Sequence, residues 1–189
     1  REGLRLNGIS DKDVTIVPVG DLGARLSALQ TGRLHGVIVA GVQTVTATKM
    51  GFKQLIDLSK LPIEISGSGI LVRRAYVMKN QEIALEFLRA WIEGIYLLKA
   101  KPEFALGVLR KYVATQDAEV LNTIYGHYKD RLVTKPTPLG RVAKSMFYLL
   151  SRSNPEIPPG NPEGFVDGRF ISQLESSGFF DEMNRQYGK

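Results

Sequence analysis

The apolar run VIVA at residues 37–40, with a glycine on each side, leaves few architectures open to this chain. Its side chains are apolar on both faces of a strand, which is typical of parallel sheets that helices cover on both sides. The residues before it predict a helix with Leu26 and Leu29 on one face, ended at Gly32 by a left-handed C-cap. A β-branched run at residues 13–19 precedes that helix. The pattern therefore predicts a right-handed strand–helix–strand unit.

Short apolar runs separated by glycine continue for about 70 residues, after which the spacing of the apolar residues becomes that of helices. Short apolar runs predict four strands and two helices, the strands at residues 13–19, 37–40, 52–58 and 70–72 and the helices at 22–30 and 43–50. Apolar residues at three- and four-residue steps then predict a long amphipathic helix over residues 80–98. Proline or aspartate predicts further helix starts after residues 101, 117, 137 and 167. We therefore expect an α/β fold with a helix-rich second half.

Composition excludes several classes of protein. With 189 residues, 43% of them hydrophobic, the chain is large enough to bury a sizeable core, and no apolar run approaches the length of a membrane span. The absence of cysteine excludes disulfides, thiolate metal sites and cysteine nucleophiles. The net charge of +6 comes from scattered basic residues that match no nucleic-acid motif, so nucleic acid is not an expected partner.

Residues with catalytic or metal-binding chemistry do not form a convincing pattern. His35 and His127 lie far apart and have no metal-ligand spacing, and neither a nucleophile elbow nor a phosphate-binding Walker loop is present. Adjacent acids such as Asp181 and Glu182 are more typical of a solvated surface than of a catalytic pair. We therefore expect no enzymatic activity, no metal and no cofactor.

The glycine-containing turns are the sites that remain, and they favour binding over chemistry. Ligands of parallel α/β sheets bind at the carboxyl ends of strands, where free N–H groups at helix starts attract anions. Such turns also occur in every α/β protein without a ligand. The candidate ligand-binding residues are Gly20, Asp21, Gly41, Val42, Gln43, Thr44, Ser66, Gly67 and Ser68. We expect side-chain hydrogen bonds from Gln43 and Thr44, backbone contacts at Gly41 and Val42, and a wall of the site at residues 66–68.

Several segments also resemble a known family. The blocks DVTIVPVGD and ARLSALQTGRLHGV, followed by MGFKQLIDLSKL, GILVRRAYV, LEFLRAWIEGIYLLKAKPEFALGVLRKY and FVDGRFISQLESSGFFDEM, resemble the periplasmic substrate-binding proteins of ABC importers. The similar group binds nitrate, sulfonates and taurine, with members related to the thiamine-precursor binders. The resemblance covers nearly the whole chain, in the order of that family's C-terminal part.

This resemblance implies a periplasmic binding protein type II-like fold of two α/β lobes that close on a ligand. Residues 1–65 would form one lobe, incomplete at its start, and residues 66–189 a crossover strand and the helices of the other. The implied function is solute binding for an ABC importer, with a small anionic, sulfonate-like or nitrate-like, or heterocyclic solute and a membrane permease as partner. The implied location is periplasmic or lipid-anchored, with the signal sequence and the N-terminal part of the protein outside this chain.

The sequence departs from the family's pattern in two places, and one alternative function remains. His35 and Gly36 stand where Asp and Ala are more common, and Ala40-Gly41-Val42 replaces a more polar turn, so the family does not identify the solute. The branch that makes the thiamine pyrimidine needs a cysteine-rich motif and is excluded. A ligand-sensing effector domain of a transcriptional regulator is the alternative function. An unpaired sheet edge would also favour self-association.

Overall fold

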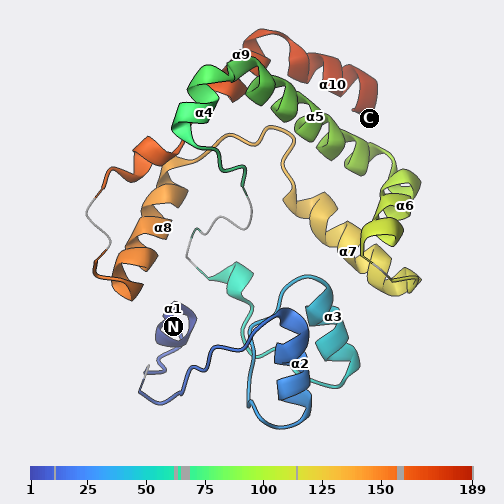
Figure 1. Ribbon diagram of the computed structural model, residues 1–189. Helices are drawn as coiled ribbons and strands as arrows, with labels where there is room; N and C mark the ends of the chain where they lie inside the picture. The colour runs from blue at the N-terminus through green and yellow to red at the C-terminus, as the bar shows by residue number, and fades with distance from the viewer. Residues whose placement is uncertain (11, 62–63, 65–68, 114, 157–159, 189) are drawn as a thin grey trace. The chain divides into compact units, whose positions relative to one another are not determined.

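The computed structural model describes residues 1–10, 12–61, 64, 69–113, 115–156 and 160–188, and these residues are mainly helical. Figure 1 shows the elements along the chain. In order, the described helices are α1 Glu2–Leu6, α2 Leu22–Gln30, α3 Val42–Lys49, η1 Leu58–Lys60, α4 Arg74–Lys79, α5 Gln81–Ala100, α6 Pro102–Tyr112, α7 Ala118–Arg131, α8 Gly140–Ser153, η2 Pro162–Phe165, α9 Arg169–Ser176 and α10 Phe179–Tyr187. None of these helices combines the length and the apolar character that a membrane span needs.

The chain divides into two compact units. Unit 1 consists of Arg1–Pro62 and Val113–His127, and unit 2 of Ile63–Tyr112 and Tyr128–Lys189. Unit 1 therefore contains α1 to α3 and most of α7, whereas unit 2 contains α4 to α6 and α8 to α10. The predicted lobes, residues 1–65 and 66–189, remain a prediction.

The predicted α/β fold class is wrong for the described part of the chain, because no strand is present there. The segments expected to be strands, at residues 13–19, 37–40, 52–58 and 70–72, have no ladder of backbone hydrogen bonds, and Leu58 begins the 3-10 helix η1. β-branched residues favour extended backbone, but a strand exists only where a neighbouring backbone pairs with it. Ile16 and Ile38 are accordingly more than half exposed. The sheet edge on which we based self-association is absent from the same residues.

The helix predictions are confirmed. Helices occupy the segments expected at residues 22–30, 43–50 and 80–98. The later helices begin at Pro102, Ala118, Gly140 and Arg169, so the third of these starts lies three residues beyond the predicted residue 137. Local side chains explain two of these starts, since Asp21 accepts a hydrogen bond from the Ala24 amide at 2.8 Å and Asp117 accepts one from the Glu119 amide at 2.9 Å. The short helix α4 was not predicted.

The core of unit 2 lies where α9 and α10 pack on α5, as Figure 1 shows. Ile92 of α5 and Leu174 of α9 have no exposed surface. The buried residues of this cluster are Ile92, Tyr96, Ile171, Leu174, Phe179, Phe180 and Met183. Gly178, with φ +76°, forms the sharp turn that lets α10 fold back beside α9. Phe179, Phe180 and Met183 thus dock the end of the chain on this core.

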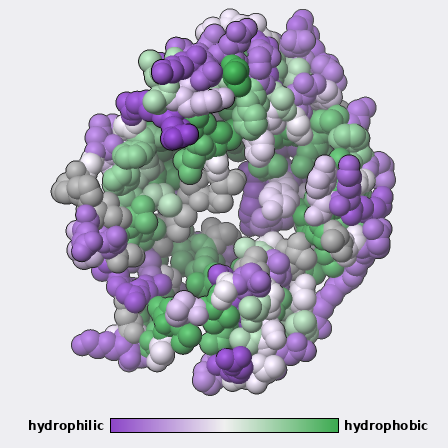
Figure 2. Space-filling view, in the orientation of Figure 1, coloured by the Kyte–Doolittle hydropathy of each residue, from purple (hydrophilic) through white to green (hydrophobic). Residues whose placement is uncertain are grey.

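The helix α5 also has a second apolar face, which is exposed in unit 2. Ile83, Phe87 and Trp91 follow one another at four-residue steps and are each about half exposed, and the rings of Phe87 and Trp91 stack with centroids 6.5 Å apart. Figure 2 shows hydrophobic residues at the surface over α5. This helix is therefore apolar around most of its circumference, and α9 and α10 cover only part of it.

The contrast between the two faces of α5 gives a matched test of the core. Replacing Ile92 with alanine leaves a cavity, and we expect it to lower the free energy of unfolding by about 2–5 kcal/mol. Ile83→Ala removes the same atoms from an exposed position on the same helix, and we expect a change within about 0.5 kcal/mol. Urea unfolding followed by circular dichroism measures both. Equal losses in the two variants would contradict the assignment of Ile92 to the core.

Candidate functional site

The first candidate turn, Gly20-Asp21, leads into α2. Asp21 is the N-cap residue of α2 and has extended backbone, and its carboxylate accepts the Ala24 amide. The residues Gly20 and Asp21 are both exposed. Because the carboxylate of Asp21 already serves as the cap, the turn offers a solute mainly its remaining backbone N–H groups.

The second candidate turn surrounds Gly41, the N-cap residue of α3. Gly41 has φ +58° and ψ −126°, a conformation that residues with a Cβ rarely adopt. Its surroundings are open, because a Cβ placed there would meet nothing within 4 Å. Val42 begins the helix, and Gln43 and Thr44 follow in the first turn with partly buried side chains. No side chain caps α3 and no acidic residue lies in its first turn, so its N-terminal N–H groups face no competing carboxylate there.

The side chain of Arg25 joins the segments that lead into these two turns. Its Nε donates to the carbonyl of Val19 at 3.2 Å, and its two terminal nitrogens donate to the carbonyls of Gly20 and Ile38, each at 3.4 Å. Val19 and Gly20 precede α2, and Ile38 lies three residues before Gly41. Figure 1 shows α2 and α3 side by side in unit 1. One guanidinium thus contacts the segments before both predicted turns, and no motif in the sequence marks Arg25 as part of a site.

The remaining predicted site residues, Ser66, Gly67 and Ser68, lie outside the described residues. His35 is exposed in the turn after α2, and His127 lies partly exposed on α7. Within the described ranges, no three side chains of the metal-ligating types gather as a metal site would require. What the structure brings together is therefore a set of backbone groups with one cation.

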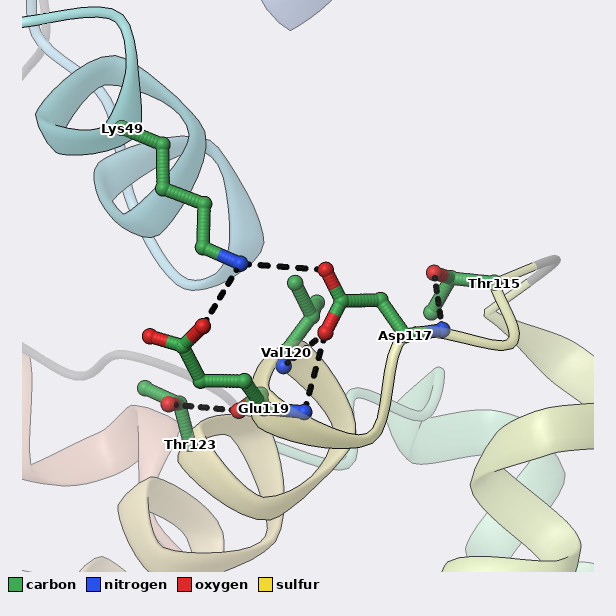
Figure 3. A network of polar contacts seen from close by, with 6 residues as sticks. All are labelled: Lys49, Thr115, Asp117, Glu119, Val120 and Thr123. Carbon is green, nitrogen blue, oxygen red and sulfur yellow. Dashed lines mark hydrogen bonds and ion pairs between the residues drawn. The ribbon is translucent and has the colours of Figure 1, made fainter.

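A second polar cluster links α3 to the start of α7 within unit 1. The ammonium of Lys49 lies 3.0 Å from a carboxylate oxygen of Asp117 and 2.9 Å from one of Glu119 (Figure 3). Asp117 also accepts the amides of Glu119 and Val120, at 2.9 and 3.2 Å, and so caps α7. The sequence predicted the cap but not the lysine, which lies 68 residues earlier in the chain.

These contacts shift the pKa values of two groups in opposite directions. Hydrogen bonding to Glu119, and then to Asp117, raises the pKa of Lys49 above its ordinary value of 10.5. Hydrogen bonding from Lys49, and then from the Val120 amide, lowers the pKa of Asp117 below its ordinary value of 3.8. The cluster therefore stabilises unit 1 fully between about pH 4 and pH 10, where both groups are charged in the folded and the unfolded chain. Its exposure to solvent keeps the effect small.

A cavity of about 310 Å³ lies in unit 2 between α5 and α10. Its lining includes the carboxylates of Glu86, Glu93 and Glu182 and the guanidinium of Arg89. Arg89 lies 5.2 Å from the ring centroid of Phe179, and its Nε lies 3.4 Å from Glu86. None of the predicted site residues lines this cavity. Arg89 thus pairs with Glu86, and Glu93 accepts a hydrogen bond from Tyr187.

Comparison with known proteins gives one family match. The model of the family described as NMT1/THI5 like matches residues 1–105, which include both candidate turns and Arg25. No curated protein and no solved structure gives a significant match.

The conformation of Gly41 allows a test of the second turn. Gly41→Ala forces a side chain into a backbone region that favours glycine, and we expect a loss of about 1–3 kcal/mol in the stability of unit 1. Gly20→Ala is the matched control, because Gly20 has no positive φ and a Cβ there also meets nothing within 4 Å. Urea titrations followed by the ¹H–¹⁵N signals of α2 and α3 measure both variants. A Gly41→Ala variant as stable as Gly20→Ala would contradict the described turn.

The cluster around Lys49 predicts a specific pH dependence. A carboxylate with a lowered pKa stabilises the folded state above its ordinary pKa and loses that effect as the pH falls through the lowered value. Asp117→Asn keeps a capping side chain but removes the charge. As the pH falls from 5 to about 2, we therefore expect unit 1 of this variant to lose less stability than unit 1 of the wild-type protein. Urea titrations followed by the signals of α3 and α7 measure this difference. A pH dependence of Asp117→Asn identical to that of the wild type would refute the linkage.

Proposed function

The chain belongs to the NMT1/THI5 like family, and from this membership we propose that it is the solute-binding component of an ABC importer. The family consists of binding proteins for nitrate, sulfonates, taurine and thiamine precursors, and its members are mostly binding proteins rather than enzymes. The observation that carries the proposal is the family match over residues 1–105, because it spans both turns that sequence and geometry mark as candidate sites.

The proposed ligand site consists of the N-terminal turns of α2 and α3. Gly41 lets a solute approach the backbone closely, and Gln43 and Thr44 supply partly buried side chains with hydrogen-bonding groups. The N–H groups of residues 42 and 43 and the partial positive charge of the helix start suit a negatively charged group.

We propose that the solute is a small anion of the sulfonate or nitrate type. No carboxylate lies in the first turn of α3, and the guanidinium of Arg25 adds a positive charge beside the segments that lead into both turns. A heterocyclic solute is the other class that the family offers, and it would need hydrogen-bond acceptors in place of a charge. The proposed partner is a membrane permease, and the proposed location is the periplasm, in keeping with a family that is typically extracytoplasmic.

A thermal-shift screen of the 189-residue chain tests this function. The panel contains taurine, nitrate, bicarbonate, benzoate and a pyrimidine, each measured at one pH and one ionic strength. A solute at 100 times its dissociation constant adds about 2.7 kcal/mol to the stability of the folded protein, so we expect a clear rise in melting temperature for an anion of the panel. A hit from the pyrimidine alone would replace the anion with a heterocycle. No hit from the folded protein would contradict the proposal.

The variant Gln43→Ala tests whether a solute found in this screen binds at the proposed site. Loss of a hydrogen bond to a charged group costs about 1.5–3 kcal/mol, so we expect the affinity for the solute to fall at least about tenfold. Gln30→Ala, at the other end of α2, is the matched control and should bind like the wild type. Titration calorimetry measures both dissociation constants. Equal affinities in the two variants would place the solute elsewhere.

A further inference from the structure

Arg25 makes an unusual set of contacts for a cation near the beginning of a helix. It lies four residues after the N-cap Asp21, where the partial charge of the helix is positive and a cation is disfavoured. Its guanidinium nevertheless turns back toward the N-terminal side of α2 and donates to the carbonyls of Val19, Gly20 and Ile38. These acceptors lie outside α2, in segments without regular secondary structure, so the contacts do not satisfy the backbone of the helix that carries Arg25.

The acceptors explain why this position suits arginine. The segments at residues 15–20 and 37–40 have no regular secondary structure, and no strand pairs with them among the described residues. Their carbonyls therefore receive no hydrogen bonds from the N–H groups of a neighbouring strand. A guanidinium has five N–H donors in a fixed fork and can donate to several carbonyls at once. Three nitrogen atoms of Arg25 reach three carbonyls on two segments. A lysine side chain has a single nitrogen atom and cannot reproduce this arrangement.

We propose that Arg25 is a positioning residue of the solute site. By holding the segment before α2 to the segment before α3, it fixes the N-terminal turns of the two helices relative to each other. The identity of the site rests on the proposed function above, whereas the positioning rests on the three contacts alone. Arg25 is not assigned a contact with the solute, because three of its donors already bind carbonyls.

The consequence for binding follows from the nature of the site. Backbone N–H groups have no rotamers with which to adapt, so a site built from them works only if the turns are held in place. The Thr44 amide donates to the carbonyl of Gly41 at 3.2 Å, and this bond reports on the geometry of the α3 turn. Releasing Ile38 from Arg25 is therefore expected to loosen this bond and to weaken solute binding without unfolding α7.

The experiment compares Arg25→Lys and Arg25→Ala with Arg33→Lys and Arg33→Ala. Arg33 is an exposed arginine in the turn after α2, and its variants control for the change in charge and side-chain length. Hydrogen exchange of the Thr44 amide, followed in ¹H–¹⁵N spectra of the full chain, measures the turn. Exchange of the Leu121 amide in α7, which donates to the carbonyl of Asp117, measures unit 1 in general. Titration with taurine and with nitrate measures binding.

We expect both Arg25 variants to exchange the Thr44 amide at least about tenfold faster than the wild type, with the Leu121 amide within about twofold. The Arg33 variants should match the wild type at both amides. Where taurine or nitrate binds the wild type, we expect about tenfold weaker binding in Arg25→Lys and wild-type binding in Arg33→Lys.

Two outcomes would overturn the assignment. Thr44 exchange within about twofold of the wild type in both Arg25 variants would show that the turn does not depend on Arg25. Equal acceleration at Thr44 and Leu121, or loss of all unit 1 signals in the mild variant Arg25→Lys, would make Arg25 a residue of general stability. Failure of the proposed function is distinguishable, because it appears as no binding in the wild type while the exchange result still decides the positioning role.

Discussion

The packing of α9 and α10 against α5 is the interaction on which unit 2 depends. Ile92 and Leu174 meet in a cluster with no solvent access to either side chain, and aromatic residues of α10 complete it. Polar contacts at its edge set the register of the helices, since the Tyr96 hydroxyl lies 3.0 Å from the Asn184 side chain and Tyr187 donates to Glu93 at 2.9 Å. This last bond also raises the pKa of Tyr187, because it favours the protonated phenol. Apolar burial thus supplies the stability, and the hydrogen bonds specify one arrangement.

Unit 1 combines a core of its own with ionic contacts. Its buried side chains are Leu26, Ala47, Val120, Leu121, Ile124 and Tyr125. Ionic side chains add contacts between distant segments: Arg25 donates to carbonyls before α2 and before α3, and Lys49 joins α3 to the cap of α7. Such contacts hold segments in a defined geometry, but each contributes little stability when it is exposed to solvent.

The helices could be predicted from the sequence because their signals are local. The apolar steps of α5 and the caps Asp21 and Asp117 lie within a few residues of what they determine. A strand forms only where a second segment, often distant in the sequence, pairs with its backbone. The runs at residues 13–19 and 37–40 have the composition of strands but no such pairing. The same limit applies to the site. The turns were found from their glycines, but carbonyl oxygens occur at every residue, so nothing in the sequence distinguishes those that Arg25 contacts.

The balance of charge at the two turns decides which solute they suit. The only carboxylate at the start of α2 belongs to Asp21, and it is occupied by the Ala24 amide at 2.8 Å, while α3 has neither a capping side chain nor an acid in its first turn. Against this, the turns carry two helix starts of positive partial charge and the guanidinium of Arg25 in the same unit. A neutral ring would gain little from this field, whereas a sulfonate or nitrate oxygen accepts hydrogen bonds that charge makes about twice as strong. The local electrostatics therefore support the proposed anion by an argument separate from the family match.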